Sequence, residues 1–135
     1  MMRLLRLFRP LWAAAGPLGR RGERFAEGYL KRRGYRILRR GYTVGRDEAD
    51  LVAVDPDGRT LVIVEVKTRR RAAPPPEASL TRAKQYRLAR LADRMRLKEP
   101  AFRNRPLRFD AVSIVWPIDG DPQVRHFVDA FESPW

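Results

Sequence analysis

The longest run of alternating and continuous apolar positions in the chain covers residues 48–67 and predicts a β-hairpin. Its two arms, residues 48–55 and 60–67, are rich in β-branched and aliphatic residues, which favour strands. The tripeptide Pro56-Asp57-Gly58 between the arms is typical of a tight turn. Both faces of each arm are mostly apolar, so we expect layers of structure to cover the sheet on both sides.

Helical and strand patterns on either side of the hairpin complete an α/β domain. A first helix is predicted over residues 19–34, where Gly34 would end it, and a second from a Ser79 cap to about Leu97. The buried stripes of these helices would be made by Phe25, Ala26, Tyr29 and Leu30 in the first, and by Leu88, Leu91 and Met95 in the second. Further strands are predicted over residues 35–42, 107–116 and 124–128. The pattern therefore predicts one α/β domain, residues 19–135, with a mixed sheet flanked by helices.

Residues 1–18 have a different composition and form a basic N-terminal extension, expected to be poorly ordered. Arginines alternate with apolar residues up to Pro10, and the apolar stretch that follows is short for a signal peptide. Two interpretations stay open: an arm that contacts phosphate or a membrane surface, and a frayed terminus or misassigned start. No apolar run has the length of a membrane helix, and we expect a cytoplasmic protein without a membrane partner.

Charged residues stand in the hairpin at positions where a buried strand normally carries none. If the loop has two or four residues, Asp50 faces Glu65 and Glu48 faces Lys67 on one sheet face. Two facing carboxylates repel each other, and a cation must offset that repulsion. Lys67 supplies one charge, and hard carboxylate oxygens would suit Mg²⁺ or Mn²⁺ as a further cation.

A second register is equally compatible with the turn sequence. A three-residue Pro56-Asp57-Gly58 loop with Gly58 in a bulge would slip the pairing by one residue. Asp50 and Glu65 would then point to opposite faces, unless a further bulge restored them. The apolar pattern does not distinguish the two registers, because both faces are apolar.

The charge of the chain points to a polyanionic partner. Its 135 residues include 29 Lys and Arg against 16 Asp and Glu, which gives a net charge of +13. Most of the cations are arginines, which bind phosphate in a bidentate fork, and nucleic acid is the most plausible partner. The sequence has no Cys and a single His, which excludes thiolate metal sites and a two-histidine zinc site.

Five short motifs in a fixed order resemble a known family. Asp50 followed by Glu65-Val66-Lys67 after a hairpin resembles the PD-(D/E)XK nuclease motif. The flanking motifs narrow the resemblance to the YraN-like family of small bacterial proteins, whose predicted fold is restriction-endonuclease-like and related to Holliday-junction resolvases. These motifs are residues 19–26, Glu48-Ala49-Asp50-Leu51, Glu65-Val66-Lys67-Thr68-Arg69, Arg108-Phe109-Asp110 and Asp129-Ala130-Phe131. Asp47 and Ala49 depart from the family pattern, which usually has Gly and an aliphatic residue there. Alternation along the first arm predicts that Ala49 lies on the wholly apolar face, together with Leu51.

The resemblance implies a Mg²⁺- or Mn²⁺-dependent endonuclease acting on structured or branched DNA. It assigns the metal to Asp50, Glu65 and the backbone carbonyl of Val66, and it makes Lys67 a catalytic residue. Residues expected to bind nucleic acid are Lys84, Arg69, Arg70, Arg71 and Arg82. Resolvase-like enzymes work as dimers, so a homodimer is implied as well. The rival hypotheses are a non-catalytic module that binds DNA or RNA with the same fold, and a basic RNA- or ribosome-associated protein.

Three other polar residues have competing interpretations. Glu23 is either a first-turn carboxylate that complements the helix dipole or, as the resemblance favours, a further acid near the metal. Asp110 is expected to be a structural partner of a nearby arginine. His126 is expected on an edge strand with no catalytic part.

Overall fold

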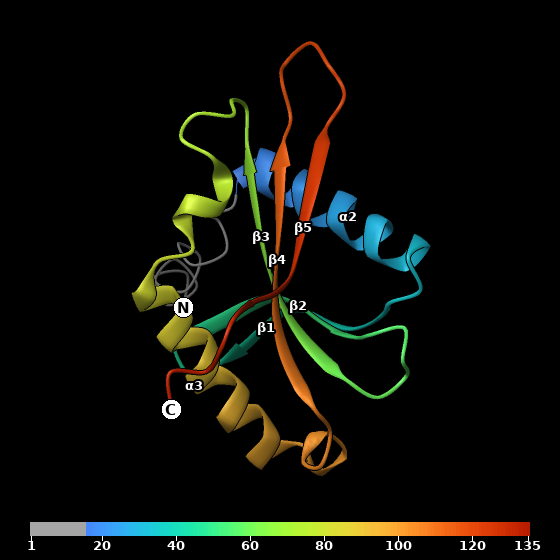
Figure 1. The fold of residues 1–135 in the computed structure, drawn as a ribbon, viewed down its shortest axis with the longest axis vertical. Coiled ribbons are helices and arrows are strands. Elements are labelled where there is room, and N and C mark those ends of the chain that lie inside the picture. The colour runs from blue at the N-terminus through green and yellow to red at the C-terminus, as the bar shows by residue number, and fades with distance from the viewer. Residues whose placement is uncertain (1–15) are drawn as a thin grey trace, which may run out of the picture.

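A computed structural model describes residues 16–135, which form five strands and two α-helices around one mixed sheet (Figure 1). The predicted extension of residues 1–18 lies outside the described residues except for its last three, which belong to a helix. In chain order the elements are α2 (Gly16–Arg32), β1 (Arg36–Val44), β2 (Asp47–Val54), β3 (Leu61–Arg69), the 3₁₀ turn η1 (Pro76–Ser79), α3 (Arg82–Lys98), the 3₁₀ turn η2 (Pro100–Phe102), β4 (Leu107–Val115) and β5 (Gln123–Phe131).

The sheet has its strands in sequence order, β1-β2-β3-β4-β5. All neighbours pair antiparallel except β3 and β4, which are parallel, so the predicted mixed sheet is confirmed. A parallel pair needs a crossover connection, and α3 occupies that connection between β3 and β4. The helix is therefore held against the sheet at both of its ends.

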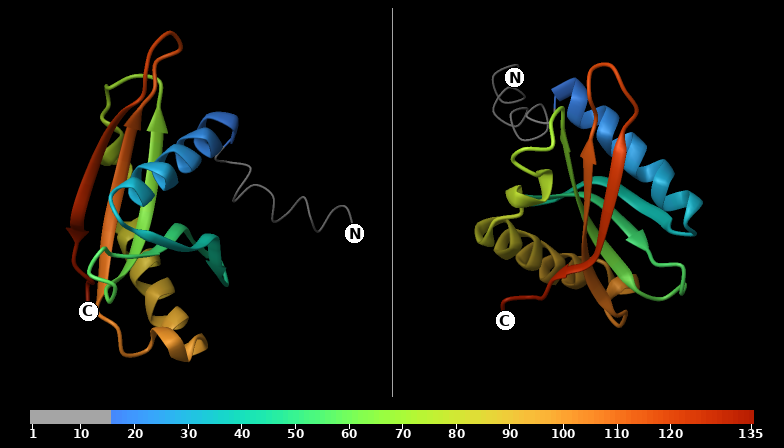
Figure 2. Two further views of the ribbon diagram at one scale, coloured as in Figure 1. Left: turned by 90° about the vertical axis from the view of Figure 1, so that its right-hand side faces the viewer. Right: turned by 45° about the horizontal axis from the view of Figure 1, so that its top comes forward.

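Each face of the sheet buries its own apolar layer, as the two-sided apolar pattern predicts. Figure 2 shows the strands with helices α2, in blue, and α3, in yellow, from two further directions. Helix α3 packs Leu88, Leu91 and Met95 against one face, and α2 packs Ala26 and Leu30 against the other. The sheet residues in the α3 layer include Val52, Val54, Leu61 and Ile63, and those in the α2 layer include Leu51, Val62, Val64 and Val66. The predicted helix stripes and the alternation of the hairpin arms from Leu51 onward are confirmed.

Two predicted helix boundaries are wrong. Helix α2 begins at Gly16, three residues before the predicted start. Helix α3 is capped by Thr81, whose hydroxyl accepts a hydrogen bond from the Lys84 amide at 3.2 Å. Ser79 instead ends η1, where its hydroxyl donates to the Pro76 carbonyl at 2.8 Å. Both hydroxyl residues can cap a helix, and the local turn geometry decides between them.

The hairpin adopts the first of the two registers. Val54 pairs with Leu61 and Leu51 with Val64, and the Asp55 amide donates to the Thr60 carbonyl at 2.9 Å across the loop. The slipped register is therefore wrong. The ladder between β2 and β3 stops at Leu51 and Val64, so Asp50 and Glu65 are not paired backbone to backbone.

The sheet face predicted for Ala49 is also wrong, and the cause lies where the ladder between β2 and β3 ends. Ala49 packs in the α3 layer with Val52 and not with Leu51 in the α2 layer. Strict alternation would put Ala49 on the face of Leu51. The alternation fails at Asp50, where β2 leaves the ladder with β3.

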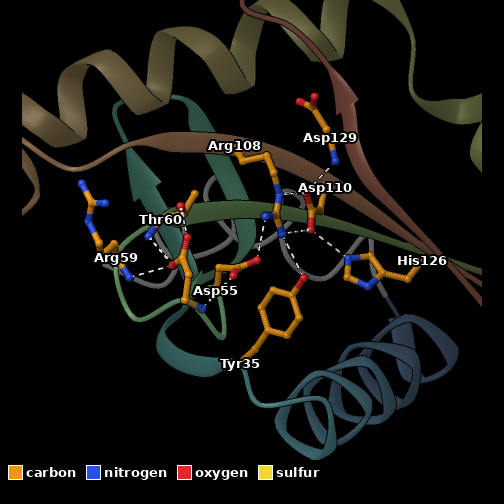
Figure 3. A network of polar contacts seen from close by, with 9 residues as sticks. Tyr35, Asp55, Arg59, Thr60, Arg108, Asp110, His126 and Asp129 are labelled. Atoms are coloured by element: carbon orange, nitrogen blue, oxygen red, sulfur yellow. Dashed lines mark hydrogen bonds and ion pairs between the residues drawn. The ribbon is translucent and has the colours of Figure 1, made fainter.

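A buried polar network ties β4 and β5 to the loop before β1 (Figure 3). The carboxylate of Asp110 accepts two hydrogen bonds from Arg108, one from the Asp129 amide, and contacts His126 Nε2 at 2.8 Å. Burial by itself would raise the pKa of Asp110, but these bonds outweigh burial and hold the pKa below its ordinary value. The expected structural role of Asp110 is consistent with this network, and His126 lies on edge strand β5 as expected.

Helix α2 approaches β3 closely at Gly22. A Cβ atom at Gly22 would overlap Thr68 Oγ1 and lie 2.8 Å from Thr68 Cβ. Only glycine leaves room for this contact, which places the next residue, Glu23, over the end of β3.

We expect Gly22→Ala to lower the free energy of unfolding by about 1–3 kcal/mol, because α2 must move away from β3 to admit the methyl group. Gly28→Ala is the matched control in the same helix, since its Cβ would meet only the flexible end of Arg32 at 3.4 Å. Helix propensity should make that control more stable by up to about 1 kcal/mol. Denaturant unfolding measures both changes, and equal stability of the two variants would contradict this view of the α2–β3 contact.

Candidate functional site

A polar cleft opens where β2 and β3 separate. Its volume is about 630 Å³. Helix α2, strand β1, the Gly45-Arg46 turn, strands β2 and β3, and helix α3 all contribute side chains to its wall. The predicted site residues Asp50, Glu65, Val66, Lys67, Glu23 and Lys84 all line this cleft.

Asp50 is held in place by the edge that β3 exposes after the ladder ends. Its Oδ2 accepts a hydrogen bond from the Val66 amide at 2.7 Å, in the place of a backbone partner. Burial, reinforced by repulsion from Glu65, raises the pKa of Asp50 well above its ordinary value, and the Val66 bond only partly offsets this. The carboxylate is thus fixed in orientation while its negative charge remains undercompensated.

Glu65 forms its ion pair with α3. Lys84 Nζ lies 2.9 Å from Glu65 Oε2, and both side chains are partly buried. The sequence assigned the compensating charge to Lys67, and the structure gives this contact to Lys84. Lys67 lines the same cleft two residues beyond Glu65.

Two further glutamates enter the cleft from β2 and α2. Glu23 is the eighth residue of α2, and the first turn of that helix contains no acid, so the helix-dipole interpretation of Glu23 is wrong. Burial, followed by repulsion from Glu48 and Glu65, raises the pKa of Glu23, and burial with repulsion from Glu65 raises the pKa of Glu48. Glu48 is absent from the predicted site residues, although its spacing of two from Asp50 could have indicated it.

Arginines form the rim of the cleft, but they differ from the predicted ones. Arg20, Arg40, Arg46 and Arg87 line it, while Arg69, Arg70, Arg71 and Arg82 are not among the lining residues. Three of the rim arginines come from α2, β1 and the β1–β2 turn, which are distant from Lys67 in sequence. Sequence proximity to Lys67 was therefore a poor guide to which cations lie beside it.

The rim residue Arg40 is held in place by Glu27 of α2. Glu27 accepts two hydrogen bonds from Arg40, at 2.7 and 2.5 Å, and also pairs with Lys31 at 2.9 Å. The hydrogen bond from Arg40 is the main cause that lowers the pKa of Glu27 to about 2. The Arg40 side chain stays 62% exposed, so its guanidinium is oriented while it remains accessible.

The donor set of the cleft fits a hard divalent cation bound with few protein ligands. Among residues 16–135, no three His, Cys, Asp or Glu side chains form a ready-made metal cluster. Mg²⁺ is commonly held by one or two carboxylates together with water and substrate phosphate, and Asp50 and Glu65 could supply that pair. Burial, reinforced by mutual repulsion, raises the pKa values of Asp50, Glu23 and Glu48, and such a cation would relieve the repulsion.

These features define a strongly basic α/β protein with a carboxylate-lined cleft, and comparison with known proteins places it in a family. Residues 22–114 match the Uncharacterised protein family UPF0102, and the chain belongs to this family, the YraN-like group that its motifs resemble. No helix within residues 16–135 is long and apolar enough to cross a membrane.

Bacterial relatives match over most of their length. A UPF0102 protein of Geotalea uraniireducens is 42% identical over 121 residues, which cover 85% of this chain and 89% of the relative. One from Pelobacter propionicus is 39% identical, covering 84% and 81% of the two chains, and one from Symbiobacterium thermophilum is 41% identical, covering 86% and 97%.

We expect Asp50→Asn to stabilise the fold at neutral pH, because it removes a buried carboxylate whose pKa is raised in the folded state. The folded pKa of Asp50 lies above its ordinary value of 3.8. Its contribution to stability is therefore complete below that value and is lost as the pH rises through the raised pKa. The asparagine oxygen can still accept the Val66 hydrogen bond. Thermal unfolding measured from acid to neutral pH should show the gain growing with pH.

Asp57→Asn is a control that should change stability in the opposite direction. Hydrogen bonds from the amide and hydroxyl of Thr60, together with the Arg59 amide, lower the pKa of Asp57 to about 2. Removing that charge should lower stability at neutral pH. If Asp50→Asn destabilised the protein as Asp57→Asn does, the cleft would not hold an undercompensated carboxylate.

Proposed function

We propose that this protein is a metal-dependent endonuclease of the PD-(D/E)XK type, with a restriction-endonuclease-like fold, acting on structured or branched DNA. The observation that carries the proposal is the convergence of Asp50, Glu65 and Lys67 in one cleft beneath a rim of arginines. The order of these residues on two hairpin strands matches the motif that the sequence resembles. The net charge of +13 supports a nucleic-acid partner.

Asp50 and Glu65 would hold Mg²⁺ or Mn²⁺, with the Val66 carbonyl as a further ligand and Glu23 acting through water. Such an ion, when bound, supplies a coordinated water of lowered pKa and neutralises phosphate charge. The Val66 amide keeps one oxygen of Asp50 engaged and so fixes the direction of the other. Glu48, beside Asp50 in the cleft, adds to the negative charge that attracts the ion.

The cations of the cleft would bind and orient the phosphodiester. Lys67 would position the attacking water and stabilise developing charge, while Lys84, next to Glu65, would contact the scissile phosphate. Arg20, Arg40, Arg46 and Arg87 would hold flanking phosphates. The predicted contacts by Arg69, Arg70, Arg71 and Arg82 would extend the DNA path beyond the cleft. A homodimer, which the resemblance to resolvases implies, would present two such clefts to a branched substrate.

A non-catalytic DNA- or RNA-binding protein is the second candidate, and one contact favours it. The Lys84–Glu65 ion pair gives Glu65 a complete structural explanation without a metal. In that case Asp50 would serve mainly to close the edge of β3 through the Val66 amide. Metal-dependent cleavage separates the two candidates.

We expect the purified protein to cleave a branched or duplex DNA with Mn²⁺ or Mg²⁺ and to lose this activity with chelator. Asp50→Asn, Glu65→Gln and Lys67→Ala should each reduce cleavage by roughly 100-fold or more, because each removes a ligand or a charge-stabilising contact. DNA binding in the absence of metal should persist in all three variants. Cleavage rates and electrophoretic binding assays measure these effects.

Lys98→Ala is the matched control for Lys67→Ala, since Lys98 is exposed at the far end of α3 and outside the cleft. It should retain the wild-type rate. Wild-type cleavage by Asp50→Asn and Glu65→Gln would identify a contaminating nuclease. An inactive wild type that still binds DNA would favour the binding protein.

Binding itself should depend steeply on salt. The rim arginines and the excess positive charge predict a plot of log affinity against log salt whose slope reports about 5 or more released counterions. Fluorescence anisotropy with labelled duplex measures this slope. A flat salt dependence, or no binding at low salt, would contradict both candidate functions.

A further inference from the structure

Two exposed aromatic side chains meet on the outer surface of α3 and form what we term the aromatic platform, Tyr86 and Trp135. Tyr86 is 47% exposed and Trp135 is 62% exposed. Their ring centroids are 5.7 Å apart, and the ring planes are tilted by 36°. Trp135 Nε1 donates to Asp93 Oδ2 at 2.7 Å, so the indole is fixed against the helix while much of the aromatic area remains accessible. The chain end lies beside α3 in Figure 1.

Helix α3 carries the platform and also part of the cleft wall, and the exposed residues that flank Tyr86 along the helix are basic, whereas Trp135 lies beside the acidic Asp93. Arg82 and Arg90 lie one helical turn before and after Tyr86, and both are exposed. Lys84 and Arg87, on either side of Tyr86 in sequence, line the cleft. A partner that fits this surface carries negative charge and also flat apolar groups. Nucleic acid with accessible bases has both properties.

The aromatic cluster around Trp116 is different. The Arg21 guanidinium covers the Trp116 ring at 4.2 Å from its centroid, and Phe25 packs against it at 5.4 Å. The Trp116 ring is therefore already packed against side chains of the protein itself. It provides an internal control for the platform.

We propose that the aromatic platform binds unpaired bases of nucleic acid by stacking. This proposal rests on the proposed function, because it assumes that nucleic acid occupies the neighbouring cleft. Stacking on aromatic rings does not depend on base identity, since every base has a flat π-face. Bases inside a regular duplex are already stacked and cannot reach the platform. The substrate class favoured by the two surfaces together is thus nucleic acid that has an unpaired segment as well as the phosphates held in the cleft.

The fluorescence of Trp135 tests the contact directly. In Trp12→Phe/Trp116→Phe only Trp135 remains, and in Trp12→Phe/Trp135→Phe only Trp116 remains. With metal chelated, an oligothymidylate should quench the first variant and leave the second nearly unchanged. An abasic oligonucleotide of the same length has the same phosphates and should quench neither. Equal quenching by the abasic strand, or no quenching of Trp135 by a bound oligothymidylate, would overturn the proposal.

Affinity measurements on the full-length chain provide the second test. Tyr86→Leu and Trp135→Leu keep an apolar side chain but remove the π-face, and each should weaken oligothymidylate binding about tenfold. Blunt duplex binding should stay within about twofold of wild type. Leu97→Ala, which removes another exposed apolar group from α3, should change neither.

The outcomes distinguish this inference from the function it rests on. Unchanged oligothymidylate affinity in both leucine variants, with duplex binding intact, would overturn the platform and leave the cleft proposal standing. A wild-type protein that binds neither the oligonucleotide nor the duplex would overturn both.

Discussion

The burial of several carboxylates close together, at the point where β2 and β3 separate, is the constraint on which the candidate site depends. The ladder between the two strands ends at Leu51 and Val64, and the Asp50 side chain accepts the next amide of β3. That bond keeps the strand edge satisfied, but it brings Asp50 within repulsive range of Glu65, Glu23 and Glu48. Lys84 from α3 offsets part of the charge. Some acids elsewhere in the fold have strong partners, as Asp47 has in Arg90.

The polar clusters around Asp110 and Asp50 differ in whether the buried carboxylate is surrounded by hydrogen-bond donors or by other carboxylates. Around Asp110 the carboxylate is surrounded by donors, and its pKa is lowered. Around Asp50 burial and like charges dominate, and the pKa is raised. A cluster of the first kind stabilises the junction of β4, β5 and the loop before β1. A cluster of the second kind costs stability and is typical of sites that bind a cation or carry out chemistry.

Sequence reasoning failed where two local rules competed or where tertiary contacts decided the outcome. The turn Pro56-Asp57-Gly58 left two registers open, and the structure selects the one in which Val54 pairs with Leu61. Helix boundaries and the face of Ala49 were wrong, because Thr81 and Ser79 are equally good caps and because alternation fails where a strand leaves its partner. Glu48 was left out of the site although its spacing of two from Asp50 indicated it. The rim residues Arg20, Arg40, Arg46 and Arg87 were missed because their proximity depends on the packing of four separate elements.

The sequence by itself determined the α/β class, the two apolar faces of the hairpin, the excess of positive charge and the family. These properties follow from periodicity, composition and motif order, which are local or additive along the chain. The tertiary structure alone decided which cation compensates Glu65, that Glu23 reaches the cleft through the close contact at Gly22, and that Tyr86 meets Trp135. Each of these joins residues far apart in sequence, and their meeting depends on how α2, α3 and the chain end pack on the sheet.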